Sequence, residues 1–207
     1  PPMKPYSESC ERNQGPILKI LQETLTNQQC VLEIASGTGQ HAVYFGRALP
    51  HLSWQTSELA QNHEGILDWL NEIKLPNVLS PIAINVNDDK WPIEIADTVF
   101  NANTVHIISW LEVERMFTGI ARVLSASGIL CLYGPFKYEG KFTSESNARF
   151  DALLRSRNRN SGIRDFEAIN RLAETHGLFL VRDVNMPSYN QTLVWKRVTQ
   201  ILKPPQA

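Results

Sequence analysis

The sequence has few cysteines and no long apolar run. Its 207 residues include 3 cysteines, Cys10, Cys30 and Cys131, an odd number without the paired spacing of a zinc site or a disulfide framework. No stretch approaches the roughly 20 apolar residues that a membrane-spanning helix needs. The first residues also lack the apolar segment of a secretory signal. We therefore expect a protein of the reducing cytoplasm that binds neither a metal ion nor a membrane.

An excess of charge of either sign is also missing. Lys and Arg together number 20 and Asp and Glu 21, for a formal net charge of -1 at pH 7. Proteins that bind nucleic acid usually carry a basic excess, so the balance favours a small-molecule ligand over nucleic acid. No repeat, low-complexity segment or Gly/Ser linker divides the chain. Its length suits one domain over residues 1–207.

Short apolar segments alternate with segments of helical periodicity through the first two thirds of the chain. The predicted strands are 31–34, 52–56, 80–86, 98–101 and 129–133. A helix over 14–25 precedes them, and the helices 40–49, 60–73 and 113–124 lie between them. This alternation is typical of parallel strands joined by right-handed helical crossovers. Two more helices follow, and then the strands 179–184 and 192–198, which should pair antiparallel because no helix separates them. We predict a doubly wound, mostly parallel seven-stranded α/β sheet with an antiparallel C-terminal hairpin.

A glycine-containing turn follows the first predicted strand, where residues 33–39 read Glu-x-Ala-x-Gly-x-Gly. Doubly wound sheets bind ligands at the carboxyl ends of their strands, where the strand order reverses. Gly37 and Gly39 permit a sharp turn and a close approach of a ligand to the backbone. Glu58, at the end of the second predicted strand, can accept both hydrogens of a ribose diol. The sequence therefore predicts a nucleoside site at this turn.

Two cofactors fit the turn. The run from Gly37 to Ala42 also satisfies the dinucleotide pattern G-x-G-x-x-A. However, the Glu33 carboxylate would repel a pyrophosphate, whereas it can help to hold the ammonium of a methionine moiety. The closing hairpin also distinguishes class I methyltransferases from most nicotinamide-binding folds. We predict a Rossmann-like class I S-adenosylmethionine-dependent methyltransferase, with an NAD-dependent oxidoreductase and a catalytically silent cofactor-binding protein as the alternatives.

Further cofactor contacts are expected around the turn. The N-terminal helical segment, residues 1–28, should fold over the cofactor, and Arg12, placed just before the first helix, should pair with its carboxylate unless it forms a surface salt bridge. The loop after the third strand should lie over the adenine, where Trp91 either covers the ring or packs in the core. The full predicted set is Arg12, Asn13, Glu33, Ala35, Ser36, Gly37, Gly39, Glu58, Leu59, Asn85, Val86 and Asn101.

The methyl acceptor is expected beyond the fourth and fifth strands. Asn103 can hold an amino or hydroxyl acceptor and His106 can take a proton near neutral pH, although the two could instead cap a turn and pack at a helix start. With Tyr133 they form the catalytic candidates. An insertion over 136–165 should line the acceptor side, where its arginines would suit an acidic acceptor unless they pair with nearby aspartates. Its candidate substrate contacts are Phe136, Ser146, Asn147 and Arg164.

With these residues in place, the chain resembles, over roughly residues 6–197, the methyltransferase-like family long filed as a domain of unknown function, which includes a small human methyltransferase-like protein. The resemblance is carried by segments 10–18, 32–41, 133–136, 140–147, 162–165 and 186–187. It implies a class I methyltransferase fold and S-adenosylmethionine as the cofactor, but no particular reaction. The family pattern has aspartate where Glu58 stands and often where Asn85 stands. Glu58 keeps the diol chemistry with a longer reach, whereas Asn85 lacks the charge.

Overall fold

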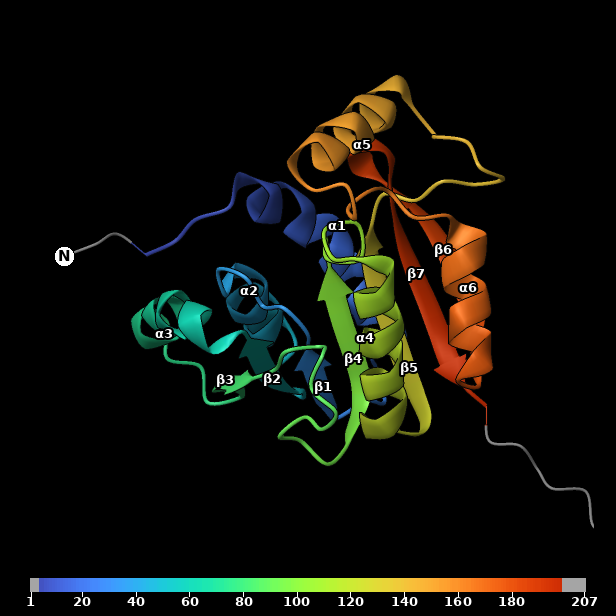
Figure 1. Cartoon of the computed structure of the whole chain (residues 1–207). Helices are drawn as coiled ribbons and strands as arrows, with labels where there is room; N and C mark the ends of the chain where they lie inside the picture. The colour runs from blue at the N-terminus through green and yellow to red at the C-terminus, as the bar shows by residue number, and fades with distance from the viewer. Residues whose placement is uncertain (1–3, 199–207) are drawn as a thin grey trace, which may run out of the picture.

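The computed structural model describes residues 4–198 and contains one seven-stranded sheet (Figure 1). The strand order is β3-β2-β1-β4-β5-β7-β6. The first five strands are parallel, and β7 pairs antiparallel with both β5 and β6. The strands are β1 Cys30–Glu33, β2 Ser53–Glu58, β3 Val78–Ala83, β4 Ala96–Ala102, β5 Leu124–Gly134, β6 Leu178–Met186 and β7 Asn190–Arg197. The predicted mostly parallel sheet with an antiparallel C-terminal hairpin is confirmed.

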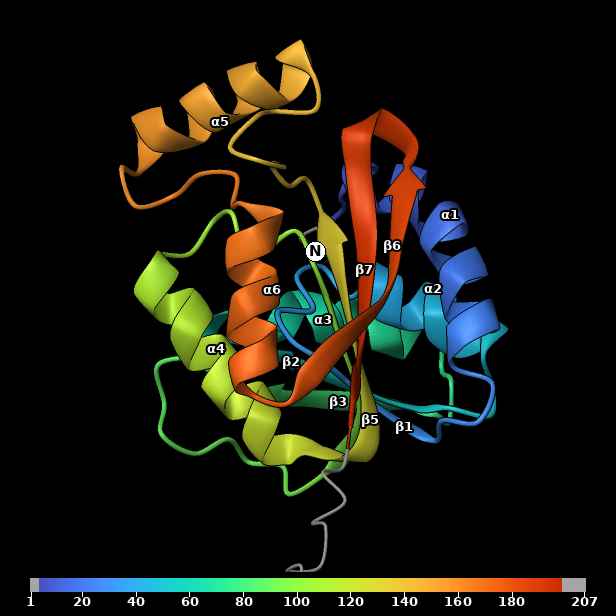
Figure 2. The same ribbon diagram turned by 90° about the vertical axis from the view of Figure 1, so that its right-hand side faces the viewer.

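Helices cover both faces of this sheet (Figures 1 and 2). The helices α4 and α6 pack on one face, and α1 and α2 pack together on the other. The helices are α1 Glu8–Thr24, α2 Gln40–Ala48, α3 His63–Glu72, α4 Trp110–Val123, α5 Glu145–Arg157 and α6 Phe166–Thr175, with short 3-10 turns at Ala60–Asn62 and Pro187–Tyr189. Figures 1 and 2 both place α5 apart from the two layers, beyond the carboxyl ends of β4 and β5.

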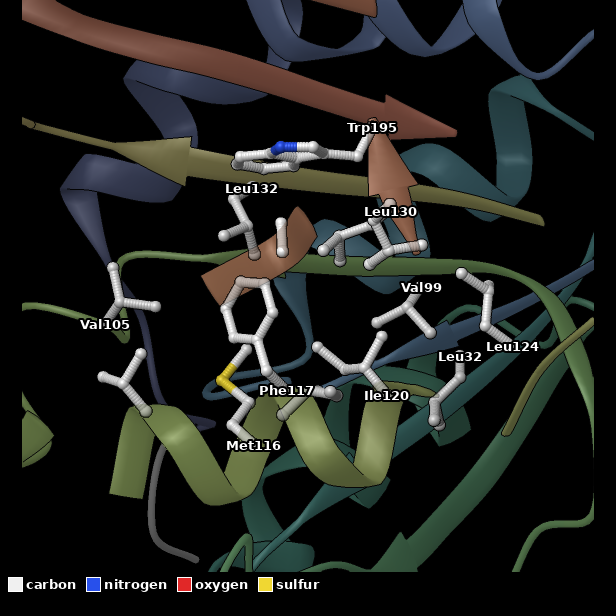
Figure 3. Packing of buried hydrophobic residues seen from close by; sticks show 14 of the residues in the cluster. Leu32, Val99, Val105, Met116, Phe117, Ile120, Leu124, Leu130, Leu132 and Trp195 are labelled. Atoms are coloured by element: carbon white, nitrogen blue, oxygen red, sulfur yellow. The ribbon is translucent and has the colours of Figure 1, made fainter. Parts of the chain in front are cut away.

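The larger hydrophobic core lies between α4 and the sheet (Figure 3). Met116, Phe117 and Ile120 recur at helical spacing, so that they share one face of α4 and meet Val99 and Leu130 of the strands. All five side chains are fully buried. A capping box between Ser109 and Glu112 fixes the start of α4. This packing holds β4 and β5, whose carboxyl ends carry candidate site residues.

The helix α1 begins earlier than the predicted start at residue 14. The Ser7 side chain accepts the Cys10 N–H as the N-cap, and the first turn is acidic. The start was inferred from apolar residues at helical spacing from Ile17 onward, and residues 8–15 offer none apart from Cys10. Arg12 and Asn13 therefore lie within α1, and the prediction that they precede it was wrong.

The described helices include no membrane-crossing candidate: within residues 4–198, none combines the necessary length with sufficient apolar character. Residues 1–3 and 199–207 lie outside the described part, and one domain over 1–207 stays a prediction.

Candidate functional site

A cavity of about 540 Å³ opens at the carboxyl ends of β1, β4 and β5. β1 pairs with β2 on one side and with β4 on the other, so the strand order reverses at this point. Doubly wound sheets bind their ligands at such a position. The predicted site residues that line the cavity are Arg12, Asn13, Glu33, Ala35, Ser36, Gly37, Asn103, His106, Tyr133 and Asn147.

Gly37 lines this cavity, and Glu58, outside the lining, is hydrogen-bonded to it. The Gly37 N–H donates to Oε2 of Glu58 at 3.0 Å, and the Leu59 N–H donates to Oε1 at 2.9 Å. The first bond crosses from the loop after β1 to the end of β2. It therefore fixes the carboxylate relative to the glycine turn.

The turn itself depends on positive φ angles. Gly37 has φ +60° and Gly39 φ +91°, which only glycine adopts without strain. A Cβ atom on Gly39 would also lie 3.2 Å from the Cα of Ile66, so this glycine allows α3 to pack closely. Ala35, where related motifs have glycine, adopts φ +55° in the same turn. Every second residue of the turn, at positions 35, 37 and 39, thus has a left-handed backbone conformation.

Glu33 is a buried carboxylate below the turn, with 2% of its surface exposed. The Trp54 Nε1–H donates to its Oε1 at 3.2 Å. Burial raises the pKa of Glu33 to about 7, hydrogen bonds from Ser36 and Trp54 act against the rise, and the charge of Glu58 adds to it. A cation that enters the cavity would favour the ionised form of Glu33.

The predicted adenine-side residues lie next to Glu58, outside the cavity lining. The Ile84 N–H donates to the Glu58 carbonyl at 3.2 Å, which brings the segment of Asn85 and Val86 beside the end of β2. The exposed Asn85 accepts the Asn87 N–H at 2.9 Å through its amide oxygen. The alternative that places Trp91 in the core is correct: this side chain is buried against Gly119 of α4, so it does not cover a ligand ring.

Two predicted site residues face away from the cavity. Asn101 is 1% exposed and donates through Nδ2 to the Ile34 carbonyl at 2.9 Å and to Thr104 Oγ1 at 2.7 Å. It therefore ties β4 to the backbone that follows β1. Phe136 is 1% exposed and belongs to the hydrophobic core, so the prediction that it contacts substrate is not supported.

A residue that the sequence did not single out, His41, lines the cavity from α2. Its Nε2 donates to Oδ1 of Asn13 at 2.6 Å, which joins α2 to α1 in a buried contact. Burial lowers the pKa of His41 to about 4, so the imidazole is neutral at pH 7. The exposed Arg12 lines the cavity too, and its Nη1 lies 3.6 Å from a carboxylate oxygen of Glu8 in a surface ion pair. The sequence signals for His41 were its place just after the turn and at the end of segment 32–41, which carries the family resemblance.

The N-terminal segment also covers the start of α2. The Ser7 N–H donates to Oε1 of Gln40 at 2.5 Å, and Nε2 of Gln40 donates back to the Ser7 carbonyl at 3.2 Å. The Gln40 N–H is bonded to Thr38 Oγ1 at 3.2 Å, and the Gly39 N–H to the Ser36 carbonyl at 3.0 Å. Several donors around the turn are thus already engaged within the protein.

His106 lines the opposite side of the cavity, after β4. It is 3% exposed, and its Nδ1 is buried without a hydrogen-bond partner among residues 4–198. Burial, with a smaller effect from the charge of Arg164, lowers its pKa to about 4, which disagrees with the expectation of proton uptake near neutral pH. Asn103, at φ +56°, donates its N–H to the Tyr133 carbonyl at 2.9 Å. Burial raises the pKa of Tyr133 to about 12, so its hydroxyl stays protonated.

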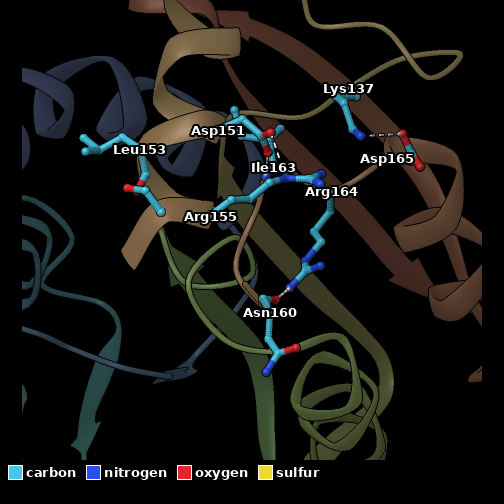
Figure 4. Close-up of polar contacts among 9 residues, drawn as sticks. Lys137, Asp151, Leu153, Arg155, Asn160, Ile163, Arg164 and Asp165 are labelled. Atoms are coloured by element: carbon cyan, nitrogen blue, oxygen red, sulfur yellow. Dashed lines mark hydrogen bonds and ion pairs between the residues drawn. The ribbon is translucent and has the colours of Figure 1, made fainter. Parts of the chain in front are cut away.

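Two arginines of the insertion, Arg155 and Arg164, have partners within the protein (Figure 4). Nε of Arg164 donates to the Val105 carbonyl at 3.0 Å, and its Nη2 donates to the carbonyls of Ile108 at 2.5 Å and Asn160 at 2.9 Å. Nε of Arg155 lies 2.9 Å from Asp151. Neither arginine lines the cavity, so the expected acidic acceptor has no support here.

The remaining members of the insertion divide between the cavity and the surface. Asn147 lines the cavity and donates through Nδ2 to the Tyr189 carbonyl at 3.1 Å. Ser146 is exposed and shares a hydrogen bond with Ser144 Oγ at 2.8 Å, outside the lining. Phe150 of α5 lines the cavity and was missed by the sequence. Within residues 4–198, no group of three or more His, Cys, Asp or Glu side chains is arranged to hold a metal ion.

The chain is similar to known proteins in sequence and in fold. The sequence model of one family, described as a protein of unknown function (DUF938), matches residues 4–197. Among solved structures, an O-methyltransferase family protein from Burkholderia thailandensis has a TM-score of 0.78 at 16% identity, with 90% of this chain and 57% of that chain covered.

Two further structures show the same fold. The S-adenosylmethionine-dependent methyltransferase SibL has a TM-score of 0.78 at 18% identity, covering 92% of this chain and 56% of that chain. An O-methyltransferase family 2 protein from Planctomyces limnophilus, in complex with apigenin, has a TM-score of 0.79 at 13% identity, covering 92% and 58%. The chain thus spans little more than half the length of these structures. It shares with them the Rossmann-like fold of class I methyltransferases.

Proposed function

The chain belongs to the family described as a protein of unknown function (DUF938), and from that premise we propose that it is an S-adenosylmethionine-dependent methyltransferase acting on a small molecule. The observation that carries the proposal is the bond from the Gly37 N–H to Glu58 at 3.0 Å, with the buried Glu33 on the other side of the turn. Two carboxylates therefore flank one glycine turn. This arrangement suits a nucleoside diol and a neighbouring ammonium.

The same geometry disfavours a nicotinamide dinucleotide. A site for pyrophosphate needs free backbone N–H groups at the start of α2, and it needs surroundings without negative charge. Instead, the N–H groups of Gly37, Gly39 and Gln40 already have acceptors inside the protein. Glu33 and Glu58 would also repel the phosphates at close range.

The cofactor contacts follow from this placement. In the proposal, Glu58 accepts the ribose hydroxyls, Glu33 faces the ammonium, and Arg12 turns from Glu8 to the cofactor carboxylate. Leu59, Asn85 and Val86 form the adenine side next to Glu58. The backbone of Ala35, Ser36, Gly37 and Gly39 forms the turn. Asn13 contributes to the cavity wall from α1, and Asn101 supports the turn indirectly by donating to the Ile34 carbonyl.

When bound, the cofactor supplies a methyl group on a positively charged sulfur. Held by Glu33, Glu58 and Arg12, the cofactor would supply this methyl group to an atom of the acceptor. We propose that Asn103, His106 and Tyr133 orient the acceptor, with His106 in its neutral form accepting the hydrogen bond from the acceptor O–H or N–H. Asn147 of the insertion would add a polar contact on the same side.

The composition also predicts a cytoplasmic location and a small molecule as the partner, with no binding of nucleic acid. Both stay predictions.

Calorimetric titration tests the cofactor. We expect S-adenosylhomocysteine to bind and NAD not to bind. Glu58→Ala should weaken S-adenosylhomocysteine binding by roughly tenfold to a hundredfold, as expected for lost hydrogen bonds to a charged group. Glu64→Ala, which removes an exposed carboxylate on α3, is the matched control and should bind normally.

Two results would count against the proposal in different ways. Binding of NAD without S-adenosylhomocysteine would indicate the oxidoreductase. Tight binding of S-adenosylhomocysteine together with a lack of methyl transfer from S-adenosylmethionine to a broad panel of small-molecule acceptors would indicate a catalytically silent cofactor-binding protein.

A further inference from the structure

The acceptor side of the cavity lacks charged side chains. The lining contributed by described residues from 102 to 190 contains no Asp, Glu, Lys or Arg. The insertion arginines Arg155 and Arg164 are held by Asp151 and by three backbone carbonyls. An ionised acceptor would lose water on this side without gaining an opposite charge, which is costly in free energy.

An aromatic side chain lines the cavity from α5. Phe150 of α5 is 36% exposed and lines the cavity, and Ile107, 47% exposed, lines it as well. The rings of Phe150 and His106 meet edge to face, with centroids 5.5 Å apart and an interplanar angle of 68°. Exposed apolar groups that line a cavity are typical of ligand contacts.

The position of Phe150 is fixed by buried polar contacts of α5. Asp151 Oδ1 accepts the Ile163 N–H at 2.8 Å, and Asn147 Nδ2 donates to the Tyr189 carbonyl at 3.1 Å. Both side chains are buried, at 6% exposure each. Phe150 is therefore presented to the cavity by an anchored helix, and its exposure does not result from a loose surface segment.

His106 adds a buried polar group beside these apolar contacts. His106 is 3% exposed, and its Nδ1 is buried without a hydrogen-bond partner among the described residues. Buried polar groups are normally hydrogen-bonded. The imidazole therefore offers hydrogen-bonding capacity at the cavity wall that the protein does not use.

Resting on the proposed methyltransferase function, we propose that the acceptor is an uncharged aromatic molecule that carries a hydroxyl or amino group. Its ring packs against Phe150 and Ile107, and its polar group points to His106. Aromatic pairs contribute more than the area they bury, so Phe150 selects for a ring over an aliphatic chain of similar size.

Two probes that share a ring system and differ in charge test this inference. We would titrate 2-naphthol and 2-naphthoate calorimetrically into the protein, with and without saturating S-adenosylhomocysteine. 2-Naphthol should bind at least about tenfold more tightly than 2-naphthoate. Phe150→Ala should weaken 2-naphthol binding about tenfold without changing the affinity for S-adenosylhomocysteine. Phe179→Ala, which removes an exposed aromatic side chain of β6 outside the cavity, is the matched control and should change neither affinity.

The two proposals fail separately in this experiment. If S-adenosylhomocysteine does not bind, the methyltransferase proposal is wrong. The titrations of 2-naphthol and 2-naphthoate into the free protein would still test which class of molecule the cavity binds. Equal or tighter binding of 2-naphthoate, or unchanged 2-naphthol binding by a folded Phe150→Ala variant, would overturn the acceptor inference while S-adenosylhomocysteine binding stands.

Discussion

Arg164 donates from Nε to the carbonyl oxygen of Val105 at 3.0 Å, at one end of a run of four consecutive carbonyls that accept from the insertion. Gly162 N–H donates to the His106 carbonyl at 2.9 Å, and Ser161 Oγ–H to the Ile107 carbonyl at 2.5 Å. Nη2 of Arg164 reaches the last carbonyl, that of Ile108, at 2.5 Å. Residues 161–164 thus hold the backbone that carries His106.

Arg164→Lys should weaken this backbone contact. Lysine keeps the charge but lacks the planar fork that spans two carbonyls. We expect the free energy of unfolding to fall by about 2 kcal/mol, and the Gly162 N–H to exchange with solvent faster. Chemical denaturation and hydrogen exchange measure the two effects. Arg149→Lys is the control, because Arg149 is exposed and forms only a surface ion pair with Glu145.

Gly39→Ala should be more destabilising than Gly140→Ala, although both residues have positive φ angles. At Gly140 a Cβ atom meets nothing within 4 Å, so only the left-handed backbone opposes the change, by about 1 kcal/mol. At Gly39 the Cβ atom would also lie 3.2 Å from the Cα of Ile66. We expect a total loss of about 2–4 kcal/mol in denaturant titrations. Equal losses at the two positions would show that α3 is free to move away.

The fold was predictable because its signals are local. Apolar segments of strand length alternate with helical periodicity, and the last two strands have no helix between them. The cofactor turn was found for the same reason, since Gly37, Gly39 and Glu58 each end or follow a strand. The start of α1 was missed because residues 8–15 lack apolar residues at helical spacing, and the Ser7 cap is recognised only once the helix is known.

The side-chain environments could not be predicted in the same way. Asn101 and Ala102 are neighbours in β4, and only Ala102 lines the cavity, because alternate residues of a strand face opposite sides. Phe150 becomes part of the cavity through the placement of α5, which depends on contacts with Ile163 and Tyr189. Arg164 was expected to contact substrate, because its carbonyl partners Val105 and Ile108 lie more than fifty residues away in sequence and could not be recognised there.

Glu33→Gln should raise stability at alkaline pH. The pKa of Glu33 is raised from 4.5 to about 7, so the folded protein binds this proton more tightly than the unfolded chain. Wild type therefore loses stability from this site as pH rises from about 4.5 to 7, and the variant does not. The variant should gain about 2 kcal/mol relative to wild type between pH 5 and pH 8. Denaturant titrations at both pH values measure this gain, and its absence would show that Glu33 is ionised without penalty.

The same variant should bind the cofactor less well. In the proposed function a cationic ligand favours ionised Glu33, so binding to wild type should release a proton below pH 7. Calorimetric titration of S-adenosylmethionine in buffers of different ionisation enthalpy measures that release. We expect proton release by wild type near pH 6 and none by Glu33→Gln. Equal proton release by both proteins would mean that another group responds to the ligand.

His41→Gln should make the protein less sensitive to acid, the opposite pH direction from Glu33. The pKa of His41 is lowered by burial from 6.5 to about 4, so the unfolded chain binds this proton more tightly than the folded protein. The contribution of this site to stability is complete above about pH 6.5 and is lost as pH falls toward 4. Between pH 7 and pH 5 the loss should be about 2 kcal/mol in wild type. Glutamine can donate to Asn13 Oδ1 as the imidazole does, but it has no proton to gain, so its unfolding free energy should fall less over the same interval. Denaturant titrations at pH 7 and pH 5 measure this difference. An equal fall in unfolding free energy for both proteins would mean that the imidazole accepts a proton without leaving its contact with Asn13. His41 could then not be a buried neutral link between α1 and α2.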